Sequence, residues 1–322
     1  AISTFGFSQD PEDALRLMYN HPLGTARSNA IGGAMGSLGG DMSSSNINPA
    51  GLGFYNKGEF YVSPFFSTKS NDFNYFGNKT NTTDSRVTLG ALGIVFTNDD
   101  SRRRSNYKSK VFSITYTKLA DYNNNISFRG QNNYSSFLEK FADQLYYDGA
   151  SEQAAKENYI YGSSLAYHSN LINPVLNSNG DITDYKANIP ISGGLNQFYD
   201  SKTKGSMSEM NFSWAGNLDD KLYLGASIVM PMVNFSRSLE YGESIANGNT
   251  PVFDFNENFT SKGFGLGAKL GLIYKVQPSL RVGFSIHTPQ VMTFNESYNA
   301  VLYSSTYPNG LSSYDLMTMY KD

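Results

Sequence analysis

Hydrophobic and polar residues alternate with a period of two along several parts of this sequence. The clearest segment covers residues 263–275, where one set of alternate positions is apolar and the other is mostly glycine. The apolar set is Phe264, Leu266, Ala268, Leu270, Leu272 and Tyr274, and the other set is Gly263, Gly265, Gly267, Lys269 and Gly271, with Ile273 as the single exception. Because successive side chains of a strand point to opposite faces, this pattern predicts a β-strand with one apolar face.

The same period predicts further strands elsewhere in the chain. Together with the first segment, the expected strands cover residues 59–68, 87–97, 111–118, 210–215, 222–230, 263–275 and 280–286. The longer ones match the roughly 9–13 residues of a tilted strand that crosses a bilayer, and they exceed the usual 5–6 residues of strands in other sheets. The pattern therefore predicts an all-β fold with membrane-spanning strands.

The gaps between these strands alternate in length. Short gaps lie at 98–108, 217–220 and 276–279, and long gaps lie at 69–85, at 119–206, at 231–262 and after Pro289. Outer-membrane barrels have short periplasmic turns and long extracellular loops, whereas a sandwich of two sheets imposes no such alternation. The spacing favours a transmembrane antiparallel β-barrel.

Composition separates this chain from helical membrane proteins. Aromatic residues make up 14% and charged residues only 16%, yet the mean hydropathy is −0.40. The longest apolar run, 222–233, is interrupted by Gly225, Ser227 and Pro231, and a membrane helix needs about 18 or more apolar residues. A β-barrel and a secreted all-β protein remain as alternatives.

Charge and cysteine content narrow the environment further. The chain has no cysteine, which fits an envelope protein that does not use disulfides. The net charge of −3 provides no basic face for nucleic acid. The first residues, AISTFGFSQDPEDAL, contain neither a basic nor an apolar signal segment, so we expect that a signal peptide has already been removed.

The first 58 residues form a block of different composition, and residues 59–322 supply the strands and loops. A short helix is expected over 13–19, and residues 24–53 are rich in Gly, Ala, Ser and Asn. Such residues cannot build a packed core alone, but they allow backbone to fit closely inside another structure. The block is therefore expected to pack inside the barrel.

The long gap at 119–206 contains two helical patterns. Ser136 and Glu139 have the spacing of a capping box. Behind them, one side of the helix carries Phe137, Leu138, Phe141 and Leu145. A second helical stretch covers 151–164. We expect a helical extracellular loop whose apolar faces pack together or hold a hydrophobic ligand.

The order of motifs in the first block resembles the FadL/TodX family of outer-membrane proteins, in the form common in Bacteroidota. The motifs are Gly24-Thr-Ala-Arg-Ser-Asn-Ala-Ile-Gly-Gly-Ala34, then Gly40-Asp41, then Asn48-Pro-Ala-Gly-Leu52 directly before the first strand. The segment 263–289, which ends in Ser-Ile-His-Thr-Pro, also resembles paired strands of that family. The resemblance covers roughly a quarter of the chain closely and the remainder by layout.

The resemblance implies a 14-stranded barrel with an N-terminal hatch inside the lumen. Hydrophobic molecules such as long-chain fatty acids or aromatic hydrocarbons would be captured by an extracellular loop groove, pass to an interior site and leave sideways through a gap in the wall. Seven predicted strands correspond to half of such a barrel. Since single-chain bacterial barrels close with an even number of strands, and an unpaired edge cannot lie in lipid, we expect the sequence to stop before the barrel closes.

Two sets of residues are candidate sites under this interpretation. The candidate hatch residues are Gly32, Gly33, Asp41, Asn48, Pro49 and Ala50, and the alternative for Asn48-Pro49 is an ordinary turn. The candidate ligand groove comprises Phe137, Leu138, Phe141 and Leu145, and the alternative is packing within the loop. Burial of apolar surface stabilises either arrangement.

Other motifs carry no cofactor or metal prediction. The glycines of 263–267 have strand spacing and no helix follows, which argues against a dinucleotide loop. His21, His168 and His287 lack zinc-site spacing, and the segment 177–184 lacks the glutamate of a calcium loop. The arginines at 102–104 are expected to be solvated in a short turn, and no nucleophile-elbow motif appears. We therefore predict no enzymatic activity and no metal.

The sequence leads to a hypothesis of passive uptake of hydrophobic small molecules across the outer membrane of a Gram-negative bacterium. The barrel would contact outer-membrane lipid and lipopolysaccharide. A rival hypothesis is a barrel that transports nothing and acts as a partner or cargo shuttle of an envelope secretion complex. A third is a secreted β-rich adhesin fragment.

Overall fold

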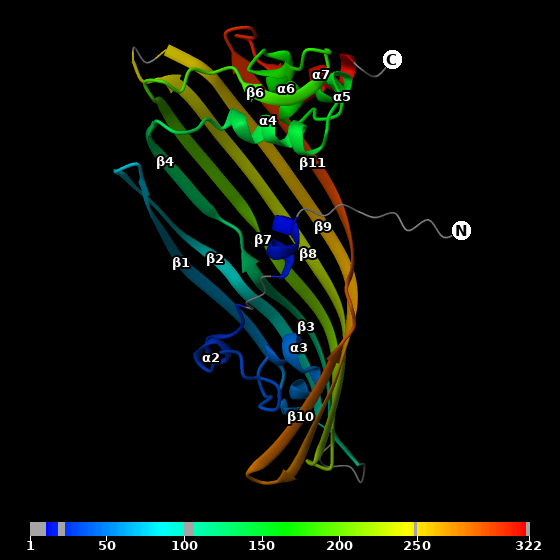
Figure 1. Ribbon diagram of the computed structural model, residues 1–322. Helices are drawn as coiled ribbons and strands as arrows, with labels where there is room; N and C mark the ends of the chain where they lie inside the picture. Colours follow the sequence, from blue (N-terminus) through cyan, green and yellow to red (C-terminus); the bar gives the residue numbers. More distant parts are fainter. Residues whose placement is uncertain (1–10, 19–22, 100–105, 248–249, 320–322) are drawn as a thin grey trace, which may run out of the picture.

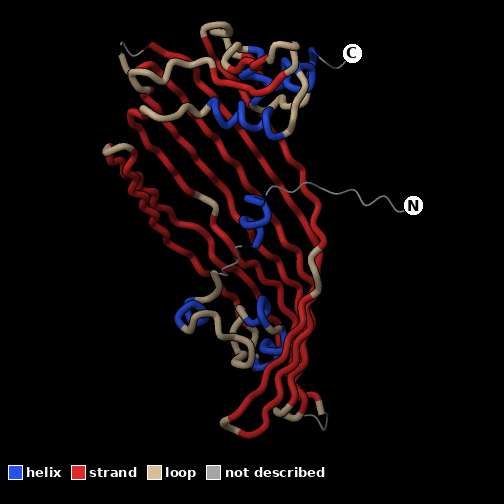
Figure 2. Tube along the Cα trace, viewed as in Figure 1, coloured by secondary structure: helices blue, strands red, loops and turns tan. Residues whose placement is uncertain are grey.

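The computed structural model describes residues 11–18, 23–99, 106–247 and 250–319 of the chain. Most of them belong to one long, curved antiparallel sheet. The N-terminal segment lies on the concave side of this sheet, and a group of short helices lies across its upper end (Figures 1 and 2). The predicted all-β class is confirmed.

The strands are β1 (Glu59–Tyr75), β2 (Asn78–Asp99), β3 (Tyr107–Asp121), β4 (Asn124–Asn132), β5 (Ile172–Leu176), β6 (Ile182–Ala187), β7 (Leu195–Leu218), β8 (Leu222–Ile245), β9 (Thr250–Gln277), β10 (Leu280–His287), β11 (Val291–Ser304) and β12 (Leu311–Ser312). The helices are α1 (Pro11–Met18), α2 (Ala26–Ala30), α3 (Ser44–Ile47), α4 (Leu138–Tyr147), α5 (Glu152–Glu157), α6 (Ser163–His168) and α7 (Ser313–Met319), with a 3₁₀ helix η1 (Pro49–Phe54).

The main sheet has the order β1-β2-β3-β7-β8-β9-β11-β12, with β4 also paired to β7 and β10 also paired to β9. β3 and β4 pair with successive halves of β7, and β10 and β11 pair with successive halves of β9. Each of these pairs therefore forms one interrupted strand of the main sheet, which is here called the wall. All seven predicted strands are present, in the predicted order.

The described strands are much longer than predicted, and every predicted long loop contains strand residues. β4, β5, β6 and the start of β7 lie within 119–206, and β11 follows Pro289. β1 and β2 are joined by a tight turn at Phe76 and Gly77, and the gap at 231–262 consists mostly of the continuing strands β8 and β9. These upper segments lack an apolar outward face and are rich in Asn, Ser and Thr, so their strand character was not visible in the hydrophobic pattern.

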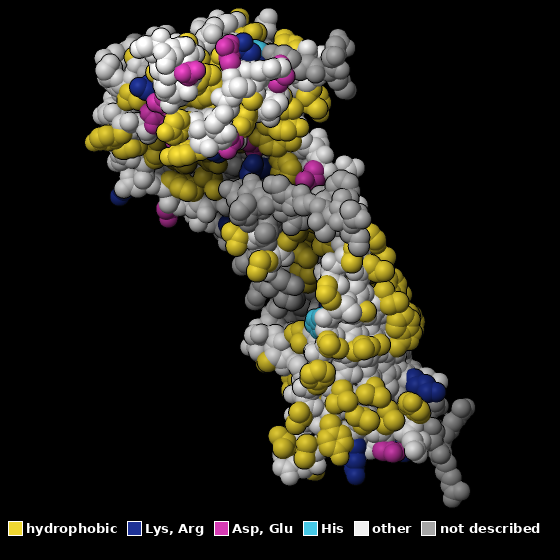
Figure 3. Space-filling view, turned by 45° about the vertical axis from the view of Figure 1, so that its right-hand side comes forward, with side chains coloured by type: hydrophobic (Ala, Val, Ile, Leu, Met, Phe, Trp, Pro, Cys, Tyr) yellow, Lys and Arg dark blue, Asp and Glu magenta, His cyan; other side chains and the backbone are white. Residues whose placement is uncertain are grey.

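The side chains of β9 alternate between two faces as predicted. Phe264, Leu266, Leu270 and Leu272 are 51, 54, 57 and 37% exposed on the convex, outer face, while the glycines and Lys269 point to the concave, inner face. Equivalent outer positions on neighbouring strands include Phe60, Phe66, Val87, Trp214, Leu224, Ile228, Val282, Phe284 and Ile286. These residues form an apolar band around the lower half of the sheet, and Figure 3 shows part of it.

Above the band, the polarity of the two faces changes. On β8 the outer positions change from Met232 to Asn234, and on β9 from Phe264 to Lys262. The register pairs Met232 with Phe264 and Asn234 with Lys262, so the change occurs at one height on both strands. Inner positions of the upper part carry the buried residues Leu239, Tyr241, Phe253 and Phe255.

The buried inner face of the upper sheet is covered by a cap, formed by α4–α7 and the β5–β6 hairpin. The first predicted loop helix is α4, and the second is divided into α5 and α6 by a turn. Ser136 Oγ accepts a hydrogen bond from Leu138 N rather than from the amide of residue 139 expected for a capping box. In the described residues no helix is long and apolar enough to cross a membrane.

The sheet does not close on itself within the described residues. β1 forms one edge, and β10, β11 and the short β12 paired to the upper end of β11 form the other. The lower parts of both edges carry exposed apolar side chains such as Phe60 and Phe284.

Candidate functional site

The candidate site lies between the inner face of the sheet and residues 23–58, here called the N-terminal block. Hydroxyl and amide side chains join the two surfaces. Ser45 Oγ lies 2.9 Å from Thr115 Oγ1 on β3, and Asn46 Nδ2 donates to Thr117 Oγ1 at 2.9 Å. Because these groups are buried, their hydrogen bonds fix the block in one position on the wall.

The Asn-Pro-Ala motif and the nearby residue Gly36 dock onto a surface of three glycines from adjacent strands. A Cβ at Gly225 of β8 would lie 2.3 Å from Ala50 N, and one at Gly271 of β9 would lie 2.0 Å from Asn48 Oδ1. On β10, a Cβ at Gly283 would lie 2.2 Å from Gly36 O. Glycine is required at these three positions because backbone and side-chain atoms of the block occupy the space of any larger residue.

Asn48 connects the block to the wall through its side chain. Its Nδ2 atom donates to Gly36 O at 2.7 Å, and contacts Leu272 O at 3.2 Å and Phe284 O at 3.3 Å. Its Oδ1 atom accepts from Ala50 N at 3.1 Å, which caps η1. Asn48 is fully buried. Asn48 thus forms a turn, as in the alternative interpretation of the Asn-Pro motif, and it also contacts the wall directly.

The remaining candidate hatch residues have separate roles within the block. Asp41 accepts hydrogen bonds from Thr25 Oγ1 at 2.7 Å and from Ser43 N at 2.8 Å, which holds two turns of the block together. Gly32 and Gly33 have φ of +63° and +77°, a conformation that side-chain-bearing residues rarely adopt. Both glycines line the pocket between the block and the wall.

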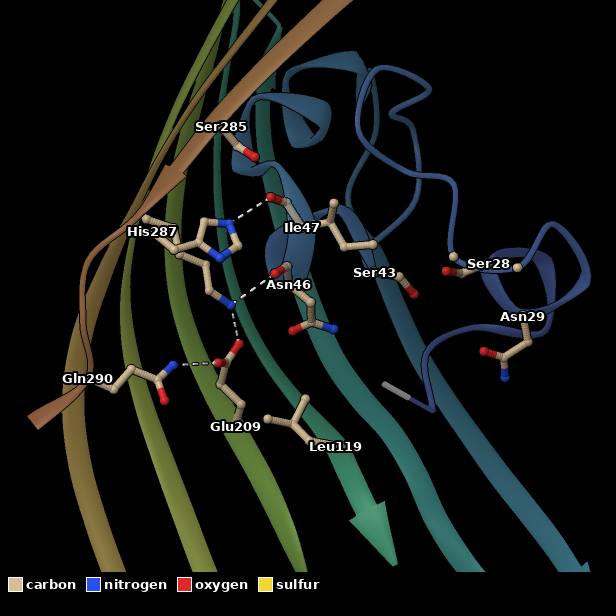
Figure 4. A pocket seen from close by; sticks show the side chains of 13 residues that line it. Ser28, Asn29, Ser43, Asn46, Ile47, Leu119, Glu209, Ser285, His287 and Gln290 are labelled. Atoms are coloured by element: carbon tan, nitrogen blue, oxygen red, sulfur yellow. Dashed lines mark hydrogen bonds and ion pairs between the residues drawn. The ribbon is translucent and has the colours of Figure 1, made fainter. Parts of the chain in front are cut away.

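That pocket has a volume of about 450 Å³, and its wall side is polar (Figure 4). Lys269 Nζ donates to Glu209 Oε1 and, at 3.0 Å, to Asn46 O of the block. Lys269 and Glu209 are both buried, so each charge is compensated by the other. Such a pair is costly to break, because removal of one partner leaves a buried charge uncompensated.

Two further wall residues complete the polar pocket. Gln290 Nε2 lies 3.4 Å from Glu209 Oε2, and His287 Nε2 lies 2.9 Å from Ile47 O of the block. His287 is the last residue of β10, and Gln290 lies in the break at residues 288–290 before β11. The wall therefore contacts backbone carbonyls of α3 through Lys269 and His287.

An apolar layer lies above this polar pocket on the inner face. Its buried members are Leu119, Ala120, Met207 and Val233, with Met292, Phe294, Tyr122 and Leu17 packed against them. Arg16 of α1 lies over the Phe235 ring at 3.6 Å, and Tyr122 Oη donates to Arg16 O at 3.2 Å. The helix α1 thus covers part of the layer.

The four candidate groove residues lie in the core of the cap. Leu138 and Leu145 are fully buried, Phe141 is 7% exposed, and Phe137 contacts Phe141, Tyr241 and Phe255 through its ring. They therefore pack within the loop and against the sheet, which is the alternative that the sequence left open. None of the pockets detailed among the described residues is lined by them.

Sequence reasoning missed three buried charged residues: Glu209, Lys269 and Glu243. The Glu243 carboxylate of β8 accepts from Ser136 Oγ, Phe137 N, Gln197 Nε2 and Tyr241 Oη at 2.6–2.9 Å. Burial, and after it the Glu243 charge, raises the pKa of Tyr241, so the phenol remains a donor. The sequence signal that could have identified such residues is a charged residue at an inward position of an alternating strand, as at Lys269.

The other sequence candidates lie apart from one another where the structure describes them. His168 and His287 belong to the cap and to β10, and His21 and the arginines at 102–104 lie outside the described residues. Asn177 Oδ1 accepts from Asn179 N and Asp181 N at 2.9 Å each, as in an Asx turn. Within the described ranges no group of three or more His, Asp or Glu residues could hold a metal ion.

Comparison of the chain with protein-family models, with curated proteins and with solved structures finds no match.

Proposed function

We propose that this chain forms part of the wall and the hatch of an outer-membrane β-barrel that takes up hydrophobic small molecules, such as long-chain fatty acids, by passive diffusion. The observation that carries the proposal is the sorting of side chains in the lower sheet. The outer face is apolar and exposed. The inner face carries glycines, polar side chains and buried apolar residues such as Val95, Val111 and Ile273, and it is covered by the N-terminal block. Hydrocarbon outside and a filled lumen inside would account for both faces.

The height of the apolar band supports residence in a bilayer. On β9 the band runs from Phe264 to Tyr274, which corresponds to about 33 Å along the strand at about 3.3 Å per residue. With a tilt of about 40° the band is about 25 Å tall, the height of the apolar belt of outer-membrane barrels.

The two open edges favour a larger barrel. In lipid, the unpaired backbone groups of β1 and β10 would each cost several kcal/mol, so we infer that further strands pair with them. The seven-strand wall and the resemblance to a 14-stranded family agree in this respect. The N-terminal block would then occupy the lumen as the hatch, with Asn48, Pro49 and Ala50 docked on the glycine surface.

A sideways exit is supported by the wall near the block. The β2–β3 ladder pairs Ala91 with Thr117 and extends no further upward. Above that point Leu23 N donates to Lys118 O at 2.8 Å, and Leu23 O would lie 3.2 Å from a Cβ at Gly90. The block thus fills a place where two neighbouring strands do not pair, and its displacement would open the wall there.

The proposed ligand site is the apolar layer on the inner face, reached from the cap. The test is binding of a fluorescent long-chain fatty acid to the detergent-solubilised protein. Met207 of this layer is 5% exposed, and Met207→Gln keeps its shape but adds a polar amide. We expect roughly tenfold weaker binding, since about 1.4 kcal/mol is tenfold and burial of an unpaired amide costs about 1–3 kcal/mol.

Met210→Gln is the matched control, because Met210 is an outward position on the same strand. Its affinity for the fatty acid should equal that of the wild type. If both variants bound the fatty acid equally well, the apolar layer would not be the ligand site. A wild-type protein that binds no fatty acid but remains in a stable complex with other envelope proteins would instead support the partner-subunit hypothesis.

A further inference from the structure

Two pockets adjoin each other on the sheet above the apolar band. One has a volume of about 620 Å³ and the other of about 340 Å³. Both are lined by β2, β4, β7 and β8. Arg129 lines the first and Asp200 lines the second, and Arg129 Nη2 donates to Asp200 Oδ2 at 3.3 Å. The two pockets therefore form one surface, here called the polar groove.

The groove opens on the outer face of the wall. The β7–β8 register is uninterrupted from Leu195↔Ile245 to Leu218↔Leu222, so Phe198 and Asp200 lie on the same face as Trp214. On β9, Asp254 lies on the same face as Phe264 for the same reason. The groove therefore stands directly above the apolar band, outside the wall and away from the interior.

The lining of the groove is almost entirely polar. It comprises the amides Asn78, Asn125, Gln131 and Asn196, the hydroxyls Thr82, Ser127, Ser238 and Ser244, the carboxylates Asp200, Glu240 and Asp254, the cations Arg129 and Lys202, and the less polar Gly130, Phe198 and Pro251. Gln197 and Glu243 also border the first pocket, but their side chains point inward and bond to each other and to the cap. Amides and hydroxyls both donate and accept hydrogen bonds. This lining suits a ligand that carries many hydroxyl groups, and it does not suit an acyl chain.

One aromatic ring is fixed within this polar lining. A Cβ at Gly242 of β8 would lie 2.3 Å from Phe198 Cε1, so the ring packs against the bare backbone of the neighbouring strand. The ring is half-buried. A rigid aromatic ring provides apolar contact area for the C–H face of a sugar at low cost in conformational entropy.

Three charged groups of the groove remain available for a ligand. Among the described residues, Asp254, Glu240 and Lys202 make no ion pair and no side-chain hydrogen bond with the protein. Partial desolvation raises the pKa of Asp254, which is the expected consequence of a carboxylate beside a ring without a partner. Ligand hydroxyls would supply the hydrogen bonds that this carboxylate lacks.

From the ring, the amides and the available carboxylates on one groove, we propose that the outer face of the upper sheet binds a saccharide chain of the bacterial surface polysaccharide. The assignment of the saccharide to the surface polysaccharide rests on the proposed function, because in an outer-membrane barrel the groove would lie just outside the lipid. The groove itself rests on the residues above. Binding there would hold the extracellular part of the wall within the polysaccharide layer and leave the interior path free.

The test uses the purified full chain in detergent on an array of bacterial surface polysaccharides and their oligosaccharides. We expect retention of at least one glycan, with affinity reduced tenfold or more by Phe198→Ala and by Asp254→Asn. Phe198→Tyr should retain binding because it keeps the ring. Tyr314→Ala removes an exposed aromatic residue of the cap and should leave binding unchanged.

The proposal would be overturned if the wild-type protein retained none of the glycans. It would also be overturned if Phe198→Ala retained a glycan as strongly as the wild type. Fatty-acid binding is measured on the same preparations. Loss of glycan binding with intact fatty-acid binding shows that the variant is folded. Glycan binding by a protein that binds no fatty acid would reject the proposed uptake and leave the groove standing.

Discussion

At the scale of single residues, glycine positions decide how closely the N-terminal block can approach the wall. Gly225, Gly271 and Gly283 lie on three adjacent strands and face the block. Other inward glycines of β9 have a different role, since Gly263 and Gly265 lie beneath the side chains of Phe294 and Met292. Of these two groups, the first couples the wall to the block.

The variant Gly271→Val tests this coupling. Its Cβ would lie 2.0 Å from Asn48 Oδ1 and 3.0 Å from Ala50 N, and overpacking of this kind costs about 1–3 kcal/mol. We expect the block to undock and limited proteolysis within residues 23–58 to accelerate by roughly tenfold. Gly267→Val is the control, because its nearest neighbour is the flexible Gln290 side chain at 3.0 Å. Equal proteolysis of the two variants would contradict the docking model.

His168 gives the cap a dependence on pH. Burial lowers the pKa of His168, and its Nε2 lies 3.2 Å from Lys156 O. A depressed pKa in the folded state means that its stabilising contribution is present above the ordinary value of about 6.5 and is lost as pH falls below it. Amide exchange of α6, corrected for intrinsic rates, should therefore show more opening at pH 5.5 than at pH 7.5. An unchanged pH dependence in His168→Gln would refute this assignment.

At the scale of elements, the cap is fixed by a strand rather than by its own helix signals. Glu243 of β8 accepts from Ser136 Oγ and Phe137 N at the start of α4. A negative charge at this position also interacts favourably with the N-terminal end of the helix dipole. The apolar side of α4 then packs on the upper sheet through Leu138, Phe141 and Leu145.

Replacement of Glu243 by Ala should loosen the cap without unfolding the sheet. Four donors would lose their acceptor, and a buried unsatisfied donor costs about 1–3 kcal/mol. We expect faster hydrogen exchange in α4, measured by mass spectrometry, with little change in the lower strands. Glu240→Ala removes an exposed carboxylate of the same strand and should not alter α4. Similar exchange in both variants would show that Glu243 does not hold the cap.

At the scale of the whole molecule, the wall changes its polarity once along its height. Below the change, apolar side chains point outward and the inner face packs against the N-terminal block. Above it, the outer positions are polar and the inner face packs against the cap. A single sheet with such a change suits a wall that is partly in lipid and partly in water, with the polar groove just above the boundary.

Trp214 provides a direct test of membrane residence. It is the sole tryptophan and is 48% exposed within the apolar band. In vesicles that contain lipids brominated on the acyl chains, its fluorescence should be strongly quenched. In the double variant Trp214→Phe/Phe198→Trp, the indole lies above the band and should keep most of its fluorescence. Equal emission of both proteins, or recovery of the chain without detergent, would reject the barrel and favour a secreted fragment.

The sequence by itself determined the order of the strands and the two faces of the lower wall. Each of the seven alternating segments lies in a strand of the main sheet, because a period of two leaves a visible pattern wherever one face is apolar. The strands β4, β5, β6, β11 and β12 were not predicted. It also singled out the Asn48-Pro49-Ala50 motif by resemblance. The upper halves of β7, β8 and β9 were missed, since their outer face is polar and the hydrophobic alternation fades there.

Only the tertiary structure decided which distant residues meet. Glu209 and Lys269 lie on different strands, and neither residue carries a local signal of its partner. The same holds for Glu243 and α4, and for Phe198 and Gly242. The tertiary structure also showed that the candidate groove residues Phe137, Leu138, Phe141 and Leu145 lie in the core of the cap. The physical reason is that periodicity reports the environment of each face, whereas the partner across a strand pair depends on register and on the curvature of the entire sheet.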